Sequence, residues 1–399
     1  MKNLRKFESK SEHDLTEDQL DFLNQYVKGE WSYNTETGFV DVLGDFRASD
    51  EGLSDLCGIN FGVVTGSFNI SENNGIQSLK GSPRKVTDFY CQDCMIETLE
   101  GSPDHVTRIF DCSKNILRSL EGGPKIVGSG ILRNLDGYYK CDYNNLENLK
   151  GAPEFVRAFI CRGNGLKTLE GGPKKASVID ASFNKLKNLV GCPDSHPLRN
   201  LSLGEFDFSD NKMVSLQGSP KKIYGSFSVK ENFISDLSYC PEVVLGNFAI
   251  SDNLDLKSLK GPLKKVSGDY FCNDNIGIDS LEGIPDFIGG KLHIDRTSVI
   301  DLEPIKTWIK NPDENFSLPR SIAYMGCKMS ENFMNRVYTE MIDAKESFSD
   351  AFVNNYKVLE RIFEDSAEYL VKHYIDKLPE PKRSDATARI FVNSKFNIY

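Results

Sequence analysis

Hydrophobic and polar positions follow one repeating order through most of the chain. Each unit opens on an aromatic or aliphatic residue and has a cysteine or another apolar residue two positions later. An asparagine follows three positions after that, and then a leucine or isoleucine, as in Phe110, Cys112, Asn115 and Leu117. Aligned on the opening residue, twelve units begin at Phe46, Phe68, Phe89, Phe110, Tyr139, Phe159, Ile179, Phe206, Phe227, Phe248, Tyr270 and Leu292.

The spacing of the units predicts a solenoid with one short strand per unit. Most steps are 20–22 residues, and two longer steps indicate insertions near residues 129–137 and 194–204. Alternation over three or four residues sends alternate side chains inward, and the recurring Gly-x-Pro turns the chain into an extended return stretch. A unit this short leaves no room for a full helix on the outer side, so we expect a parallel sheet along a concave face.

The asparagine of each unit is predicted to form a structural ladder. It comes directly after the strand, where its amide group can bond backbone groups that would otherwise be buried unpaired. Cys94 replaces it once, and Glu51 and Thr297 hold the position in the end units. The ladder consists of Asn73, Asn115, Asn144, Asn164, Asn184, Asn211, Asn232, Asn253 and Asn275.

These residues resemble the leucine-rich-repeat family, whose core reads Leu-x-Leu-x-x-Asn/Cys-x-Leu. The resemblance covers about residues 40–305. The Gly-x-Pro ending and the aromatic-x-Cys strand are most similar to uncharacterised repeat proteins of large tailed phages. The resemblance implies an α+β repeat fold that acts by binding, and a viral, phage-encoded origin.

The two ends of the chain are predicted to cover the terminal layers. At the start, Thr16 and Gln19 form a capping box before a helix, and residues 31–33 and 39–42 predict a hairpin around 35–38. Apolar residues recur with helical period after 330. We therefore expect an N-terminal cap over 1–43, the solenoid over 44–305 and a C-terminal helical domain over 306–399, which could be a large cap or an oligomerisation and docking domain.

Charge and hydropathy restrict the setting in which the chain acts. The net charge is −10, which argues against general nucleic-acid binding and against docking on anionic lipid. No apolar run approaches the ~18 residues of a membrane span. Residues 1–14 lack an apolar signal core. We expect a cytoplasmic protein, in the host cytoplasm if it is phage-encoded, without membrane insertion.

The cysteines are predicted to be inert core thiols. Cys91-x-x-Cys94 could be half of a redox or zinc site, but Cys91 holds the inward strand position and Cys94 the asparagine position. The Cys-x-Asp string of some ubiquitin ligases occurs at Cys91 and Cys272, again inside repeats, and Cys327 in the C-terminal region lacks it. We expect no enzyme, no metal and no cofactor.

The outward positions of the strands carry the candidate binding site. Exposed aromatics among acids are typical of interface anchors, and the acids suit a basic partner. The predicted protein-binding residues on the concave face are Tyr90, Asp93, Asp142, Tyr143, Arg162, Asp180, Phe183, Asp207, Asp210, Phe271 and Asp274.

The sequence favours a protein-interaction module that binds a host or phage protein. A structural component of a virion or of its assembly, anchored by the C-terminal domain, is the alternative. A surface glycan binder ranks third, because the chain shows no secretion signal. The identity of the partner and the oligomeric state stay open.

Overall fold

The computed structural model describes residues 15–128, 136–198 and 204–299 together with the backbone of 322–323. The chain divides into two compact units, Met1–Ile179 and Asp180–Tyr399, and each is described by itself. The predicted C-terminal helical domain over 306–399, with Cys327, and most of the two insertions lie outside the described residues. Within the described part, no helix is long and apolar enough to cross a membrane.

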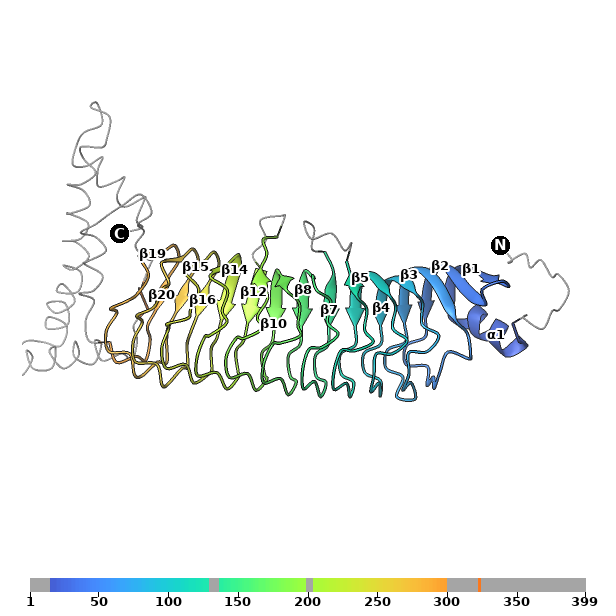
Figure 1. Ribbon diagram of the computed structural model, residues 1–399, viewed down its shortest axis with the longest axis horizontal. Helices are drawn as coiled ribbons and strands as arrows, with labels where there is room; N and C mark the ends of the chain where they lie inside the picture. The colour runs from blue at the N-terminus through green and yellow to red at the C-terminus, as the bar shows by residue number, and fades with distance from the viewer. Residues whose placement is uncertain (1–14, 129–135, 199–203, 300–321, 324–399) are drawn as a thin grey trace, which may run out of the picture. The chain divides into compact units, whose positions relative to one another are not determined.

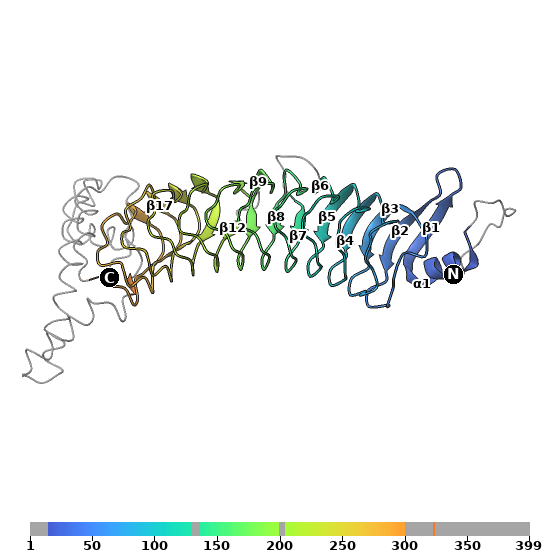
Figure 2. The same cartoon turned by 60° about the horizontal axis from the view of Figure 1, so that its bottom comes forward.

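A helix and a hairpin stand at the N-terminal end of the first unit. Helix α1 (Glu17–Tyr26) begins at the capping box of Thr16 and Gln19. Its Leu23 and Tyr26 are buried, and the Tyr26 ring lies 5.9 Å from that of Phe46. Strands β1 (Val27–Asn34) and β2 (Phe39–Arg47) pair antiparallel beside the helix (Figure 1, Figure 2). The helix thus covers the apolar side of the first layer.

The sheet of the first unit continues from the hairpin as a parallel array in chain order (Figure 1). The order β1-β2-β3-β4-β5-β7-β8-β10 skips β6, which pairs with β5, and β9, which is not part of this sheet. The strands after the hairpin are β3 (Phe61–Asn69), β4 (Lys85–Tyr90), β5 (His105–Asp111), β6 (Ile126–Val127), β7 (Tyr138–Lys140), β8 (Ala158–Ile160) and β9 (Lys175–Ala176), with β10 (Val178–Asp180) at the end of the unit.

The second unit contains two parallel sheets. The main sheet has the order β12-β14-β16-β18-β20-β21, and a second sheet has the order β13-β15-β17-β19. The main strands are β12 (Gly204–Asp207), β14 (Gly225–Ser228), β16 (Phe248–Ala249), β18 (Tyr270–Phe271), β20 (Leu292–His293) and β21 (Ile322–Ala323). The others are β11 (Asp194–Ser195), β13 (Lys222–Ile223), β15 (Val243–Val244), β17 (Lys265–Val266) and β19 (Phe287–Ile288).

The second sheet is a feature that the sequence analysis did not predict. It forms in the stretch after the Gly-x-Pro turn. The sequence analysis predicted only an extended return segment there. In the early layers of the first unit the equivalent residues, such as Lys85 and Val86, merge with the main strand through a register shift, whereas β6 and β9 stay separate. Strands β3, β4 and β5 are therefore longer than the predicted three or four residues.

The opening aromatic residues of the repeats stack into a continuous core within each unit. Phe89 and Phe110 are register partners on adjacent strands, and their rings lie 5.7 Å apart and nearly parallel. In the second unit Phe227 and Phe248 repeat this arrangement at 5.9 Å. These rings are fully buried, and each contributes roughly 1.5–3 kcal/mol through removal of apolar surface from water. Each solenoid turn, or layer, therefore contributes one buried side chain, in most layers an aromatic ring, to a shared core.

The ladder asparagines join each layer to the one before it. The Asn73 amide nitrogen donates to the carbonyl oxygens of Ala48, Ile70 and Ser71 at 2.7–3.1 Å. Its oxygen accepts from the backbone nitrogens of Glu51 and Leu53 at 3.1 and 2.9 Å. Asn253 makes the same kind of bonds in the second unit. One side chain therefore satisfies several backbone groups of two neighbouring layers.

Charges at the first position after each turn alternate in sign from layer to layer. Lys174 pairs with Glu154, and Lys221 Nζ lies 3.8 Å from Glu242 Oε1. Each exposed pair contributes at most about 1 kcal/mol, but alternation avoids like charges one layer, about 4.8 Å, apart. The positions are Arg84, Asp104, Lys125, Glu154 and Lys174 in the first unit and Asp194, Lys221, Glu242, Lys264 and Asp286 in the second.

Candidate binding surface

The residue before each ladder asparagine has a left-handed backbone. Tyr143 has φ 49°, Gly163 has φ 64° and Phe183 has φ 56°. Asparagine, aspartate and glycine tolerate this conformation best, while a bulky side chain there is unfavourable. In the other layers φ is 52–62°, with aspartate at Asp50, Asp93, Asp210, Asp252 and Asp274 and a longer charged residue at Glu72, Lys114, Glu231 and Arg296.

We call the outward strand residues and the two residues before each ladder asparagine the strand face. In the first unit, Tyr143 is 48 % exposed on this face and Tyr90 is half-buried. The guanidinium of Arg162 lies 5.4 Å from the centre of the Tyr143 ring. Asp93 is exposed, and its carboxylate lies 3.6 Å from Lys114 Nζ. None of these rings belongs to the buried core.

The second unit carries the remaining predicted residues on its own strand face. Phe183 is 52 % exposed, and half-buried Phe271 stacks on His293 with ring centres 4.5 Å apart. Asp274 accepts a hydrogen bond of 2.6 Å from Arg296 Nη2, which holds the pKa of its carboxyl below the usual range. Asp180, Asp207 and Asp210 are half-buried.

Several of the acids have a local structural role. Asp207 Oδ1 accepts from the backbone nitrogen and the hydroxyl of Ser209, at 2.9 and 2.6 Å. Asp180 and Ser182 make the same pair of bonds, and Asp142 accepts from the Ser113 hydroxyl at 3.3 Å. Such side-chain bonds to the residue two positions later stabilise a turn. Part of the acidic pattern read from the sequence therefore serves the turn after each strand.

The strand face of the second unit is hollowed. A depression of about 540 Å³ is lined by Glu205, Asp207, Lys230, Phe271 and His293, among others. Burial, followed by the charges of Asp207 and Asp180, raises the pKa of Glu205. The rings of Phe271 and His293 offer an apolar contact, and the nearby carboxylates attract a cation. Both features lie in the same depression.

The described cysteines are free thiols, and all of them except Cys57 and Cys192 are buried in the core. Cys91, Cys112 and Cys141 directly follow the adjacent strands β4, β5 and β7 and are fully buried, and burial raises the pKa of each thiol well above its usual range. Cys272 is also buried, with its pKa raised to about 12. The thiolate is the nucleophilic form, so these groups are unreactive at neutral pH. Over the described residues, no three histidine, cysteine or acidic side chains are grouped to hold a metal ion.

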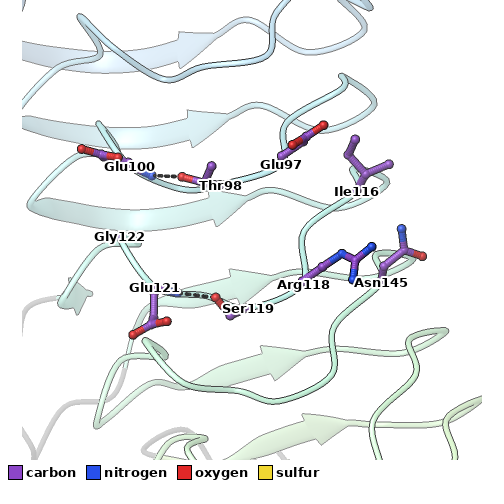
Figure 3. A pocket seen from close by; sticks show the side chains of 9 residues that line it. All are labelled: Glu97, Thr98, Glu100, Ile116, Arg118, Ser119, Glu121, Gly122 and Asn145. Carbon is purple, nitrogen blue, oxygen red and sulfur yellow. Dashed lines mark hydrogen bonds between the residues drawn. The ribbon is translucent and has the colours of Figure 1, made fainter.

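Another hollow, of about 640 Å³, lies among the loops of the first unit (Figure 3). Glu97, Glu100, Glu121 and Arg118 line it. The Thr98 and Ser119 hydroxyls face it and accept from the backbone nitrogens of Glu100 and Glu121 at 3.0 and 3.4 Å. These bonds stabilise successive turns, and the lining contains no nucleophile–base pair.

A row of apolar residues in the second unit was missed by the sequence analysis. Phe233, Leu254 and Ile276 each follow a ladder asparagine directly, and all three are exposed. The signal is one column of the aligned repeats, the position directly after the ladder asparagine, whereas the predicted binding residues all precede the asparagine position. A hollow of about 630 Å³ borders Phe233 and Leu254.

Comparisons with known proteins yield only distant likenesses. No family model matches the sequence, and no curated protein matches it. YopM from Yersinia pestis, described as a leucine-rich effector protein, has 16% identity and a TM-score of 0.33 and covers 71% of this chain and 77% of its own. YopM from Yersinia enterocolitica has 17% identity and a TM-score of 0.23 and covers 71% and 78%.

With TM-scores this low, these likenesses do not bear on the partner, and the fold rests on the strand pairing itself. Parallel strands in chain order, a ladder asparagine in most layers and a shared aromatic column agree with the leucine-rich-repeat pattern of the sequence. The chain is a parallel-sheet solenoid whose repeat resembles the leucine-rich repeat.

Proposed function

We propose that this chain is a protein-interaction module that binds a protein partner through the strand face. The observation that carries the proposal is the exposure of Tyr143 and Phe183 at left-handed positions. A bulky residue in that conformation costs about 1–2 kcal/mol, and these rings add nothing to the aromatic column of the core. Aromatic anchors on a polar face are typical of interface hot spots.

The resemblance to phage repeat proteins extends this proposal. The partner would be a protein of the host cytoplasm or of the phage itself. The acids of the strand face favour a partner with a basic surface, and such charges mainly accelerate association at low salt.

Affinity capture with the full chain tests the proposal. Capture from cells that produce the protein would compare the wild type with a Tyr143→Ala, Phe183→Ala double variant by quantitative mass spectrometry. Tyr239→Ala is the matched control, because Tyr239 is a similarly exposed aromatic in a turn outside the strand face. We expect a protein that the wild type and the control capture and the double variant loses. Equal capture by the double variant would overturn the proposal and direct attention to residues 306–399.

A further inference from the structure

Three exposed apolar side chains occupy equivalent positions in successive layers of the second unit. Phe233, Leu254 and Ile276 each follow a ladder asparagine, and the ladder fixes their register. Asn253 accepts from the Ile234 nitrogen at 3.0 Å, and Asn275 accepts from the Asn253 nitrogen at 2.8 Å. Single exposed apolar residues are normal, but an uninterrupted row marks a surface that binds something. We call these three residues the apolar row.

A groove runs beside the apolar row. Its hollow of about 630 Å³ is bounded on one side by Phe233, Leu254 and Lys212. On the other side are the left-handed positions Phe183, Asp210, Glu231 and Asp252, with Asn184, Asn211 and Asn232 also in the lining. All of these residues belong to the second unit. One wall is therefore mainly apolar and the other mainly acidic.

The acidic wall is crowded with negative charge. A hydrogen bond between the side chains of Glu231 and Asp210, together with their mutual repulsion, raises the pKa of the Glu231 carboxyl. Burial and the charge of Asp274 raise the pKa of Asp252. Lys212 is turned toward the ring of Phe233, with Nζ 5.3 Å from its centre. Cations supplied by a partner would relieve this repulsion.

The spacing of the apolar row distinguishes between shapes of partner. Adjacent layers are about 4.8 Å apart, so the row covers about 10 Å. A helix rises about 10.5 Å over seven residues, so side chains at i, i+3 or i+4, and i+7 meet all three layers. An extended strand places same-face side chains about 6.7 Å apart, out of step with the layers.

We infer that this groove binds a basic amphipathic helix of a partner protein. Apolar side chains of the helix pack on Phe233, Leu254 and Ile276, and its lysines or arginines face Asp210, Glu231 and Asp252. The inference rests on the proposed function, because it names the kind of partner, and it adds a contact surface beside the strand face.

A synthetic helix tests the inference directly. A fluorescein-labelled lysine–leucine peptide of about 14 residues, about 21 Å long as a helix, would carry its leucines on one face. Fluorescence anisotropy would measure its binding to the full chain. We expect Leu254→Ser to weaken binding by at least about ten-fold, or about 1.4 kcal/mol. Tyr239→Ser is the matched control, since Tyr239 is 56 % exposed and Leu254 is 61 % exposed, and it should leave binding unchanged because Tyr239 lies in a turn outside the groove and the strand face.

Two further peptides separate shape from charge. One has the same composition with its leucines spread around the helix, and the other has glutamate in place of lysine; both should bind at least about ten-fold more weakly. Equal binding of either peptide, or wild-type affinity in Leu254→Ser, would overturn the inference. The double variant at Tyr143 and Phe183 could lose the captured partner while Leu254→Ser keeps it. That result would support the proposed function and would overturn only the inference that the groove binds a helix.

Discussion

The ring of Tyr143 lies against Gly163, the residue that holds the equivalent position one layer later. A Cβ atom on Gly163 would lie 2.5 Å from Cδ1 of Tyr143, so any larger residue would collide with the ring. Arg162, beside this glycine, faces the same ring at 5.4 Å. The exposed ring is therefore held in place before any partner arrives, which lowers the entropy lost on binding.

Gly163→Ala should destabilise the chain and displace the ring. At φ 64° an alanine costs about 1–2 kcal/mol, and the contact with Tyr143 adds to that cost. Urea denaturation would measure the change in the free energy of unfolding. Gly165→Ala in the same turn is the control, because its nearest contact is an ordinary 3.5 Å to the Leu146 carbonyl oxygen. Equal effects of the two substitutions would contradict the assigned contact.

Asn164→Ala should lower the free energy of unfolding by roughly 1–3 kcal/mol. The substitution removes donors to the carbonyl oxygens of Cys141, Cys161 and Arg162 at 3.0–3.2 Å and leaves those groups unpaired. Asn145→Ala is the comparison, since Asn145 is an exposed asparagine outside the ladder. An unchanged melting temperature in Asn164→Ala would be incompatible with a structural ladder.

Cys112→Ala should leave partner binding intact and cost only core packing. The thiol is fully buried, and burial raises its pKa, so little thiolate exists at neutral pH. Iodoacetamide followed by peptide mass spectrometry should find Cys112 unmodified in the native protein and modified in urea. Modification under native conditions, or loss of binding in a folded Cys112→Ala variant, would show that the thiol is chemically active.

Glu231→Gln should raise thermal stability at neutral pH. The folded-state pKa of Glu231 is raised by the hydrogen bond and charge of Asp210, so ionisation of Glu231 disfavours the folded state. This unfavourable contribution is present above the folded-state pKa and disappears as pH falls through it and protonates the group. The melting temperatures of variant and wild type should therefore differ at pH 7 and converge in acid. A difference in melting temperature between variant and wild type that persists in acid would show that the effect has another cause.

Most of the solenoid could be predicted from the repeat, because each position of the repeat unit has one structural role. Alternation placed Phe110 and Cys112 inward, and both are buried. The asparagine position followed from the need to satisfy backbone groups after each strand. The second sheet was missed because two-residue strands such as β13 carry too little alternation to be recognised.

The candidate surface was less predictable. The sequence placed Tyr143 and Phe183 outward, but did not show that their backbone is left-handed, although repeated Asp-Asn and Gly-Asn pairs such as Gly163–Asn164 are turn signals. It also could not separate acids that stabilise turns, such as Asp207, from those that line the groove, because both look alike without their hydrogen bonds.

The affinity of the captured partner for the Tyr143→Ala, Phe183→Ala double variant tests the central claim most directly. Isothermal titration calorimetry would compare it with the wild type and with Tyr239→Ala, with the melting temperature of each protein recorded alongside. We predict a loss of at least about 2 kcal/mol, roughly thirty-fold in Kd, with little change in melting temperature and no loss in Tyr239→Ala. Wild-type affinity in the folded double variant would contradict the claim that the strand face is the binding surface.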